Sequence, residues 1–243
     1  MLNPRQEVVR NDVVEQLDRE LTRMAIAQYE TPEFKLLFST PLTLQRARVN
    51  AILTVHYGIN RRDCWAYVQA RCPYNVKKTI WEHEKDELSF DPRGGADHRT
   101  LQLKEAMALD LTEEDVNGYE LPPLIVSAFY GWLHIAATFP WLGVLTAFHA
   151  LERRNNNQII PGGSISKQWR DKLVNEVGIP PDRLASTNVH VEADVDHSDS
   201  IWQAIVPYVT DERAYRDALD GAAASYKIDR AYRAASAHIL RAV

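Results

Sequence analysis

The sequence is poor in cysteine and in glycine. Only two cysteines, Cys64 and Cys72, occur among the 243 residues, and neither lies in a CxxC pair. Two cysteines cannot build the disulfide framework of a small secreted domain, so a reducing cytoplasm is expected. With only ten glycines, tight turns are sparse, which favours long helices over a many-stranded sheet.

Long apolar segments and charge of a single sign are also lacking. No segment reaches the ~18 charge-free apolar residues that a membrane span needs, and the opening MLNPRQE lacks the apolar core of a secretory signal. The net charge is -5, and the basic residues are scattered among acids, whereas a nucleic-acid-binding protein carries a basic stripe. We therefore expect a cytoplasmic protein that binds neither nucleic acid nor a membrane.

Apolar residues recur at helical spacing along most of the chain. In the segment from Arg5 to Tyr29, for example, Val13, Leu17 and Leu21 share one face. The same periodicity predicts further helices over residues 43–72 (broken near 58–60), 75–88 (with Asn75 as N-cap), 97–108, from 112, on both sides of Pro140, over 167–177 and 185–208, and from 211 to the end. No repeat, low-complexity tract or linker interrupts them. The sequence predicts one all-α domain over residues 1–243.

The segment from His190 to His197 contains the clearest cluster of candidate metal ligands. Each residue of an α-helix advances by about 100°, so His190, Asp194 and His197 fall within an arc of roughly 60°. The same face continues to Ile201 and therefore turns toward the core. Such triplets also occur on solvated surfaces, so this one alone leaves both interpretations open.

Two other predicted helices place acids on apolar faces. The stripe Trp141, Leu145, Phe148 continues to Glu152, where leucine would be expected. An earlier stripe consists of Val76, Ile80, Glu84 and Glu87. His98 then begins the next helix. Ordinary alternatives exist for each: a solvated helix end for Glu152, surface salt bridges with lysines for Glu84 or Glu87, and a first-turn position for His98.

The combination of these residues favours a metal centre. Burying three carboxylates without counter-charge would cost several kcal/mol each. Two divalent cations would supply a charge of +4 to balance the charge of -3 on the three carboxylates. Imidazole with carboxylate suits iron or manganese, while a structural zinc site more often includes thiolate. Inward-facing Glu and His from different helices can build such a site inside a bundle. The predicted ligands are Glu87, His98, Glu152, His190, Asp194 and His197, with Glu84 as a substitute for Glu87.

These motifs resemble those of the heme-oxygenase-like diiron oxidases and oxygenases, which are related in fold to the TENA/THI-4 and PQQ-synthesis protein C group. The similarity extends from about residue 42 to residue 208. It is specific at three places, namely Asp86-Glu87-Leu88 with His98, Ala150-Leu151-Glu152, and His190 with Asp194 and His197. The segment between Glu87 and His98 is longer than is usual in the family, and the first-helix carboxylate of some members has no counterpart.

The resemblance implies a heme-oxygenase-like helical bundle with two iron ions per chain and dioxygen as co-substrate. The six predicted ligands would then be the catalytic residues. Glu87, His98 and His197 would hold one iron, and the other would be held by Glu152, His190 and Asp194, with at least one bridging carboxylate. The implied reaction is N-oxygenation, desaturation or C–C cleavage of a small amino-acid- or fatty-acid-like substrate in specialised metabolism. An external electron donor would be a further partner.

Two other functions stay open. One is a cofactor-free or thiaminase-like enzyme of the TENA type, whose nucleophile would be Cys64 or Cys72. The other is a non-catalytic helical binding protein.

Several further side chains have two interpretations each. The aromatic residues that could form a water-excluding wall or only core are Phe129, Trp132, Phe139, Trp141 and Phe148. The arginines that could bind a substrate carboxylate or only solvate the surface are Arg61, Arg62 and Arg153. The residues of the last helix that could cap the site or form a homodimer are Tyr226, Arg230, Tyr232, Arg233 and Arg241.

Overall fold

The computed structural model describes residues 4–243, with side chains from residue 12 onward. Within this part the chain forms α-helices, short 3-10 and π-helical turns, and no β-strand. The α-helices are α1 (Pro4–Tyr29), α2 (Pro32–Ser39), α3 (Leu44–Arg71), α4 (Tyr74–Leu88), α5 (His98–Ala108), α6 (Glu113–Asn117), α7 (Pro123–Thr138), α8 (Trp141–Arg153), α9 (Ile165–Lys172), α10 (Ala185–Ile205) and α11 (Glu212–Ala242). The all-α class is confirmed. One domain over residues 1–243 stays a prediction, and residues 1–3 lie outside the described part.

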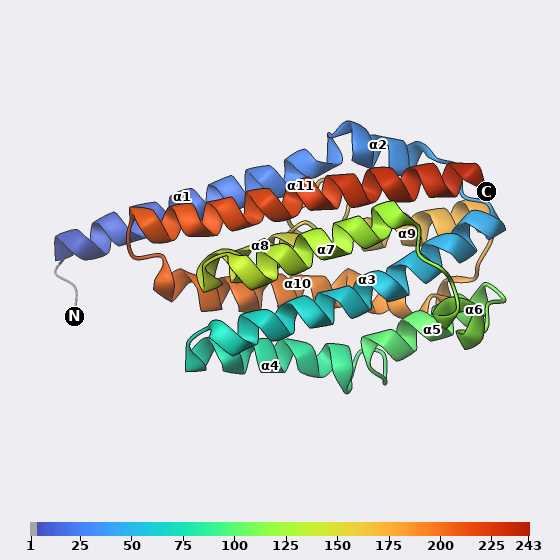
Figure 1. Cartoon of the computed structure of the whole chain (residues 1–243), viewed down its shortest axis with the longest axis horizontal. Coiled ribbons are helices and arrows are strands. Elements are labelled where there is room, and N and C mark those ends of the chain that lie inside the picture. Colours follow the sequence, from blue (N-terminus) through green and yellow to red (C-terminus); the bar gives the residue numbers. More distant parts are fainter. Residues whose placement is uncertain (1–3) are drawn as a thin grey trace.

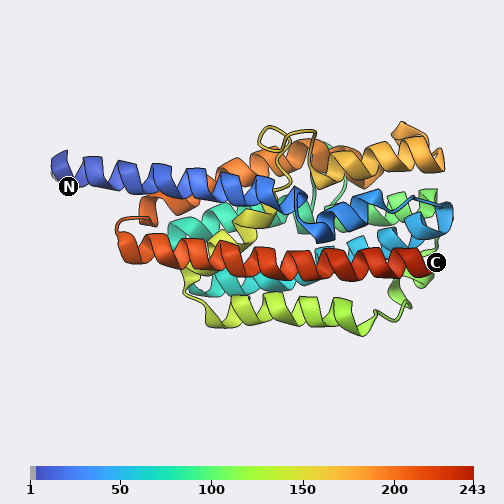
Figure 2. The same cartoon turned by 90° about the horizontal axis from the view of Figure 1, so that it is seen from above.

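The long helix α11 packs against α1, α2, α7 and α8 (Figure 1). It approaches α8 closely, because a side chain at Gly221 would overlap the backbone of Gly143. Figure 2 shows α1 alongside α11, with the N-terminal end of α1 projecting beyond the other helices. The α8–α11 packing fixes the position of α8, which carries Glu152.

A second set of helices lies below this layer in Figure 1 and consists of α3, α4, α5 and α10. Helix α10 packs against α4, α5, α8 and α9, and α3 packs against α4, α5, α7 and α8. The bundle therefore encloses an interior between α3, α4, α5, α8 and α10. The predicted acids and histidines lie on four of these helices.

Two details of the predicted helices are wrong. Helix α3 runs without the break expected near residues 58–60. Gly58 instead allows a close approach, since a Cβ there would lie 3.0 Å from Gln102 Oε1 of α5. Asn75 is not an N-cap, because α4 already begins at Tyr74 after Pro73. Short α2 was not predicted; it buries Phe34 and Leu37.

Side chains and prolines at the helix starts agree with the predicted positions of three other helices. The Asp97 side chain accepts a hydrogen bond from the backbone N–H of Thr100 and so caps α5. Thr112 and Asp115 form a reciprocal capping box at the start of α6. Pro140 precedes α8 as its N-cap residue, which agrees with helices on both sides of it.

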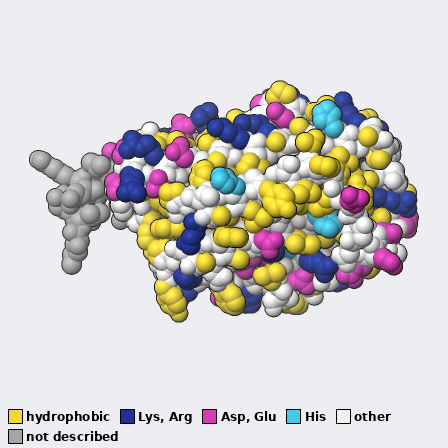
Figure 3. Space-filling view, viewed as in Figure 1, with side chains coloured by type: hydrophobic (Ala, Val, Ile, Leu, Met, Phe, Trp, Pro, Cys, Tyr) yellow, Lys and Arg dark blue, Asp and Glu magenta, His cyan; other side chains and the backbone are white. Residues whose placement is uncertain are grey.

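The surface has a mixed character. Figure 3 shows lysines, arginines and acids interspersed with apolar side chains over one face. Among the described residues, no helix combines the length and the apolar character needed to cross a membrane.

Candidate metal centre

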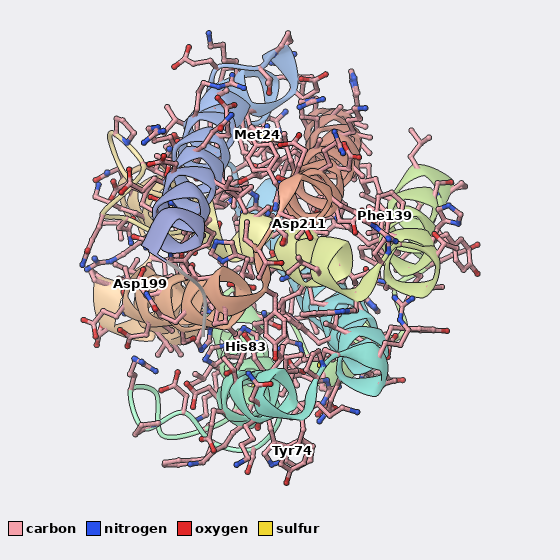
Figure 4. The ribbon with its side chains drawn as sticks, turned by 90° about the vertical axis from the view of Figure 1, so that its left-hand side faces the viewer. Met24, Tyr74, His83, Phe139, Asp199 and Asp211 are labelled. Carbon is pink, nitrogen blue, oxygen red and sulfur yellow. The ribbon has the colours of Figure 1, made fainter. Side chains whose placement is uncertain are left out.

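Residues from α4, α5, α8 and α10 converge in the enclosed interior. Figure 4 shows His83 between the ribbons of α4 and α10. Two groups of side chains each place three ligand atoms within 4.8 Å of one another. One group is His83, Glu152 and His197, and the other is Glu87, His98 and His190. Five of the six predicted ligands belong to these groups, and Asp194 belongs to neither.

The grouping differs from the one that the family resemblance implied. His197 lies with Glu152 instead of with His98, and His190 lies with Glu87 and His98 instead of with Glu152. The two histidines are seven residues apart on α10, which is about 10 Å along the helix axis. They therefore face different ends of the interior. Glu87 lies between the groups, because its Oε1 is 3.1 Å from His98 Nδ1 and 3.9 Å from His197 Nδ1.

His83 was not predicted as a ligand. It is buried, and its ring centroid lies 4.3 Å from that of His197 and 4.9 Å from that of Trp65. The signal was present in the sequence, since positions 76, 80, 83 and 87 follow the same 4-3-4 spacing that identified Glu152.

Each of the four histidines has one ring nitrogen next to an oxygen of the protein. The pairs are His83 Nδ1 with Glu84 Oε1 at 2.9 Å, His98 Nε2 with Asp91 Oδ2 at 2.8 Å, His190 Nδ1 with the Ser186 carbonyl at 2.9 Å, and His197 Nε2 with Asp86 Oδ2 at 3.4 Å. Metal-binding histidines are oriented in this way, because the partner oxygen fixes the ring and the tautomer.

The opposite nitrogens of three of these rings face carboxylates, at 3.1 Å for His98 and 3.9 Å for His83 and His197, but form no hydrogen bond within the described part of the chain. Nε2 of His83 and Nδ1 of both His98 and His197 are buried without a hydrogen bond among the described residues. Buried polar atoms are nearly always satisfied, so three such nitrogens beside carboxylates call for a ligand. The residues present therefore fit metal ions bound by imidazole and carboxylate.

The carboxylates have protein counter-charges that the sequence argument did not include. Arg61 Nη2 donates a hydrogen bond of 2.7 Å to Glu152 Oε1. Arg62 Nη1 forms ion pairs with Glu87 Oε2 at 2.8 Å and Glu84 Oε1 at 3.0 Å. Burial of acids without counter-charge was thus a wrong premise, and the unpartnered histidine nitrogens are the stronger evidence for metal.

These arginines also lower the pKa values of two of the acids that they contact. Burial alone would raise the pKa of Glu87, but Arg62 and His98 hold it well below its ordinary range. Burial likewise opposes ionisation of Glu152, yet Arg61 lowers its pKa to about 2. Both groups are therefore charged carboxylates at neutral pH, in the form that binds metal.

Glu84 and Asp194 are different. Burial raises the pKa of Glu84 to about 7, and its Oε1 contacts both His83 Nδ1 and Arg62 Nη1. Its role as a substitute for Glu87 stays a prediction. Burial and the charge of Glu152 raise the pKa of Asp194 well above its usual range. Asp194 accepts a hydrogen bond of 3.1 Å from Ser166 Oγ. It belongs to neither three-residue group, although Glu87 and Glu152 both act on its pKa.

The histidines also differ in the direction in which their pKa values are shifted. Burial lowers the pKa of His83 well below its ordinary value and that of His190 to about 4, so both rings are neutral. Burial also disfavours the charged form of His98, but Glu87 and Asp91 raise its pKa to about 9. Without metal, His98 therefore carries a proton, which a metal ion must displace.

The longer segment before His98 has a structural role. It places Asp91, which is fully buried, against the His98 ring. Arg93 from the same segment pairs with Asp91, Asp86 and Asp196 and so joins the segment to α4 and α10. The departure from the family pattern thus supplies a buried carboxylate that orients the His98 ring.

A cavity of about 140 Å³ adjoins the centre. Glu87, Glu152, His190 and Asp194 are among the residues that line it, together with side chains of α3, α8 and α11. Neither cysteine lines it, and burial raises the pKa of Cys64 to about 12. A thiolate nucleophile therefore has no support in this geometry.

The other side chains singled out from the sequence lie elsewhere. Arg153 pairs with Asp18 of α1. The candidate aromatic wall does not line the cavity. Phe148 nevertheless lies close to the centre, since the Arg61 guanidinium stands 5.0 Å from its ring centroid.

The fold and the buried imidazole–carboxylate cluster define a helical protein of heme-oxygenase-like architecture with a candidate metal centre. Residues 50–230 match the model of the iron-containing redox enzyme family, and the chain belongs to that family. The resemblance stated from the sequence is confirmed at the level of this superfamily. No curated protein matches the sequence.

Solved structures show the same fold. A domain of unknown function with a heme oxygenase-like fold from Shewanella denitrificans OS217 gives a TM-score of 0.72 at 12% identity, over 94% of this chain and 91% of that one. A CADD-like protein of unknown function from Nostoc punctiforme PCC 73102 gives a TM-score of 0.73 at 14% identity, over 96% of this chain and 98% of that one. A TenA homologue from P. horikoshii OT3 gives a TM-score of 0.61 at 17% identity, over 91% of this chain and 99% of that one.

Proposed function

We propose that this chain is a non-heme diiron oxidase or oxygenase. One iron ion would bind His83, Glu152 and His197, and the other Glu87, His98 and His190. Asp194 stands close enough to both groups to act as a shared carboxylate once it loses its proton. The observation that carries the proposal is the set of three buried histidine nitrogens that face carboxylates without a hydrogen bond in the described structure, each opposite a nitrogen held by a protein oxygen.

Bound iron would supply electrons to dioxygen and stabilise negative charge on its oxygens. The protein's own residues prepare the site. Asp91 accepts a hydrogen bond from His98 Nε2, so the proton lost on metal binding leaves from Nδ1. Arg61 and Arg62 balance part of the acidic charge. The rings of Trp65 and Phe148, 5.7 Å apart between centroids, help to exclude water on the side of His83.

The cavity limits the substrate to a small organic molecule. This volume suits the amino-acid- or fatty-acid-like substrates that the family resemblance implies. Electrons beyond those that the substrate provides would come from an external donor. A homodimer remains a proposal as well.

Anaerobic titration of the purified chain with Fe(II), followed by oxygen exposure, tests the proposal. We expect close to two iron ions per chain and a transient visible absorption band whose decay depends on a candidate amino or fatty acid. The His83→Ala and His190→Ala variants should each lose iron. A Cys64→Ala, Cys72→Ala double variant should keep it, because neither thiol lines the cavity.

The rival functions predict other results. A non-catalytic binding protein would hold well under one iron per chain. A thiol-dependent enzyme would keep its iron but lose all activity in the double cysteine variant.

A further inference from the structure

The cavity lining also includes Arg154 and Arg233, which form a cluster of positive charge. Asp229 of α11 is fully buried between two arginines. Arg154 donates to it through Nε at 2.7 Å and through Nη2 at 3.1 Å, and Arg233 donates through Nε at 3.2 Å. One carboxylate thus faces two guanidinium groups. Burial would raise the pKa of Asp229, but the arginines hold it below its ordinary value, so the cluster keeps one excess positive charge.

The donors of Arg154 are already used. Besides Asp229, its guanidinium contacts Asn155 Oδ1 and the hydroxyl of Tyr57, the latter at 3.3 Å. Arg154 is almost completely buried, with 1% of its surface exposed. This side chain therefore acts as part of the frame that holds Asp229.

Arg233 is different, because the only partner of its guanidinium among the described residues is Asp229, at Nε. Its two terminal nitrogens have no hydrogen bond or ion pair within the described part, although only 8% of the residue is exposed. The guanidinium carbon lies 4.9 Å from the Tyr232 ring centroid and 5.6 Å from that of Tyr57. These rings and Asp229 fix the group while it lines the cavity.

A buried guanidinium with free terminal nitrogens favours a planar anion that accepts two parallel hydrogen bonds, which a carboxylate does. Two other guanidinium groups that line the cavity, those of Arg61 and Arg62, already pair with the protein's own acids. The lining also includes the apolar side chains of Ala47, Ala51, Leu109 and Leu151. Charged and apolar groups thus both face the cavity.

We propose that Arg233 anchors the carboxylate of a small organic acid, whose carbon chain extends through the cavity toward Glu87 and Asp194. An engineered cavity of about 150 Å³ holds benzene, so 140 Å³ suits a chain of about five carbons. The place of reaction at the candidate metal centre rests on the proposed diiron function, whereas the anchoring contact needs no metal. Helix α11 thereby supplies a substrate contact.

Isothermal titration calorimetry with pentanoate, 1-pentanol and pentylamine tests this assignment. The protein is the full chain, both as purified and after anaerobic loading with Mn(II). We expect pentanoate to bind both forms, and to bind Arg233→Gln at least ~10-fold more weakly, as for loss of a charge-assisted hydrogen bond. The alcohol and the amine should bind more weakly than pentanoate. Lys227→Gln removes the same charge from an exposed position of α11 and should leave pentanoate binding unchanged.

Equal binding of pentanoate to Arg233→Gln and to the wild-type chain would overturn the proposal. Arg233→Lys keeps the charge but not the paired donors. Its affinity for pentanoate should therefore lie between that of the wild-type chain and that of Arg233→Gln. Should Arg233→Gln fail to fold, the wild-type comparison still decides, since 1-pentanol binding as tightly as pentanoate also refutes the anchor. A chain that binds pentanoate but no metal would contradict the diiron function and leave the anchor intact.

Discussion

Replacing Arg61 by glutamine removes the guanidinium that pairs with Glu152. The pair is buried, with 3% of the Arg61 side chain and 9% of the Glu152 side chain exposed, and its N–O distance is 2.7 Å. Removing one partner of a buried ion pair leaves an uncompensated charge and costs about 3–5 kcal/mol. Since whole domains are stable by about 5–15 kcal/mol, metal-free Arg61→Gln should unfold at much lower urea concentration.

A divalent ion bound by His83, Glu152 and His197 would replace the missing charge. Metal at about 100 times its dissociation constant stabilises a folded chain by about 2.7 kcal/mol. The variant should gain more than the wild-type chain, because its Glu152 has lost its protein partner. We expect the deficit caused by Arg61→Gln to shrink by at least about 1.4 kcal/mol, or tenfold in metal affinity, when Mn(II) is present.

Urea unfolding followed by circular dichroism, with and without Mn(II), measures both quantities. Arg19→Gln is the control, because the Arg19–Glu15 pair is more than two-thirds exposed on each side and contributes at most ~1 kcal/mol. A deficit of the same size with and without Mn(II) would show that Arg61 and the metal do not share Glu152, which would refute the reasoning.

Three further predictions follow from the same contacts. The His98 pKa rises from 6.5 to about 9 on folding, so its stabilising effect is complete below pH 6.5 and is lost as the pH rises through 9. Urea titrations of the metal-free chain should show a loss of about 3 kcal/mol over this range, and His98→Gln should remove it. Asp91→Asn should weaken Mn(II) binding about 10- to 100-fold in equilibrium dialysis, because Asp91 orients His98; unchanged affinity would contradict that role. Gly221→Ala should lower the free energy of unfolding by at least about 1–3 kcal/mol, because α8 and α11 would have to separate; a fully stable variant would show that they can.

The helical architecture could be predicted because periodicity and caps are local properties of the chain. The acids on apolar stripes were visible for the same reason, and Glu152 is buried beside His83 and His197 as its stripe position predicted. The pairing of the histidines could not be predicted, because it depends on how far α10 is shifted along α4 and α5. His190 and His197 occupy one face of α10 and yet meet different partners.

The roles of Arg61 and Arg62 also lay beyond the sequence. Both lie within the long helix α3, and only the packing of α3 against α4 and α8 shows that their partners are buried acids. His83 is a different case. The spacing of His83 from Val76 and Ile80 places it on their apolar helix face. The charged residues around it in the segment 82–87, however, are typical of an exposed segment.

The most direct test of the account is X-ray diffraction at the iron absorption edge from crystals grown anaerobically with Fe(II). We predict two anomalous peaks, one bounded by His83, Glu152 and His197 and the other by Glu87, His98 and His190. The absence of iron from both places, with the four histidine rings oriented as they are here, would contradict the central claim.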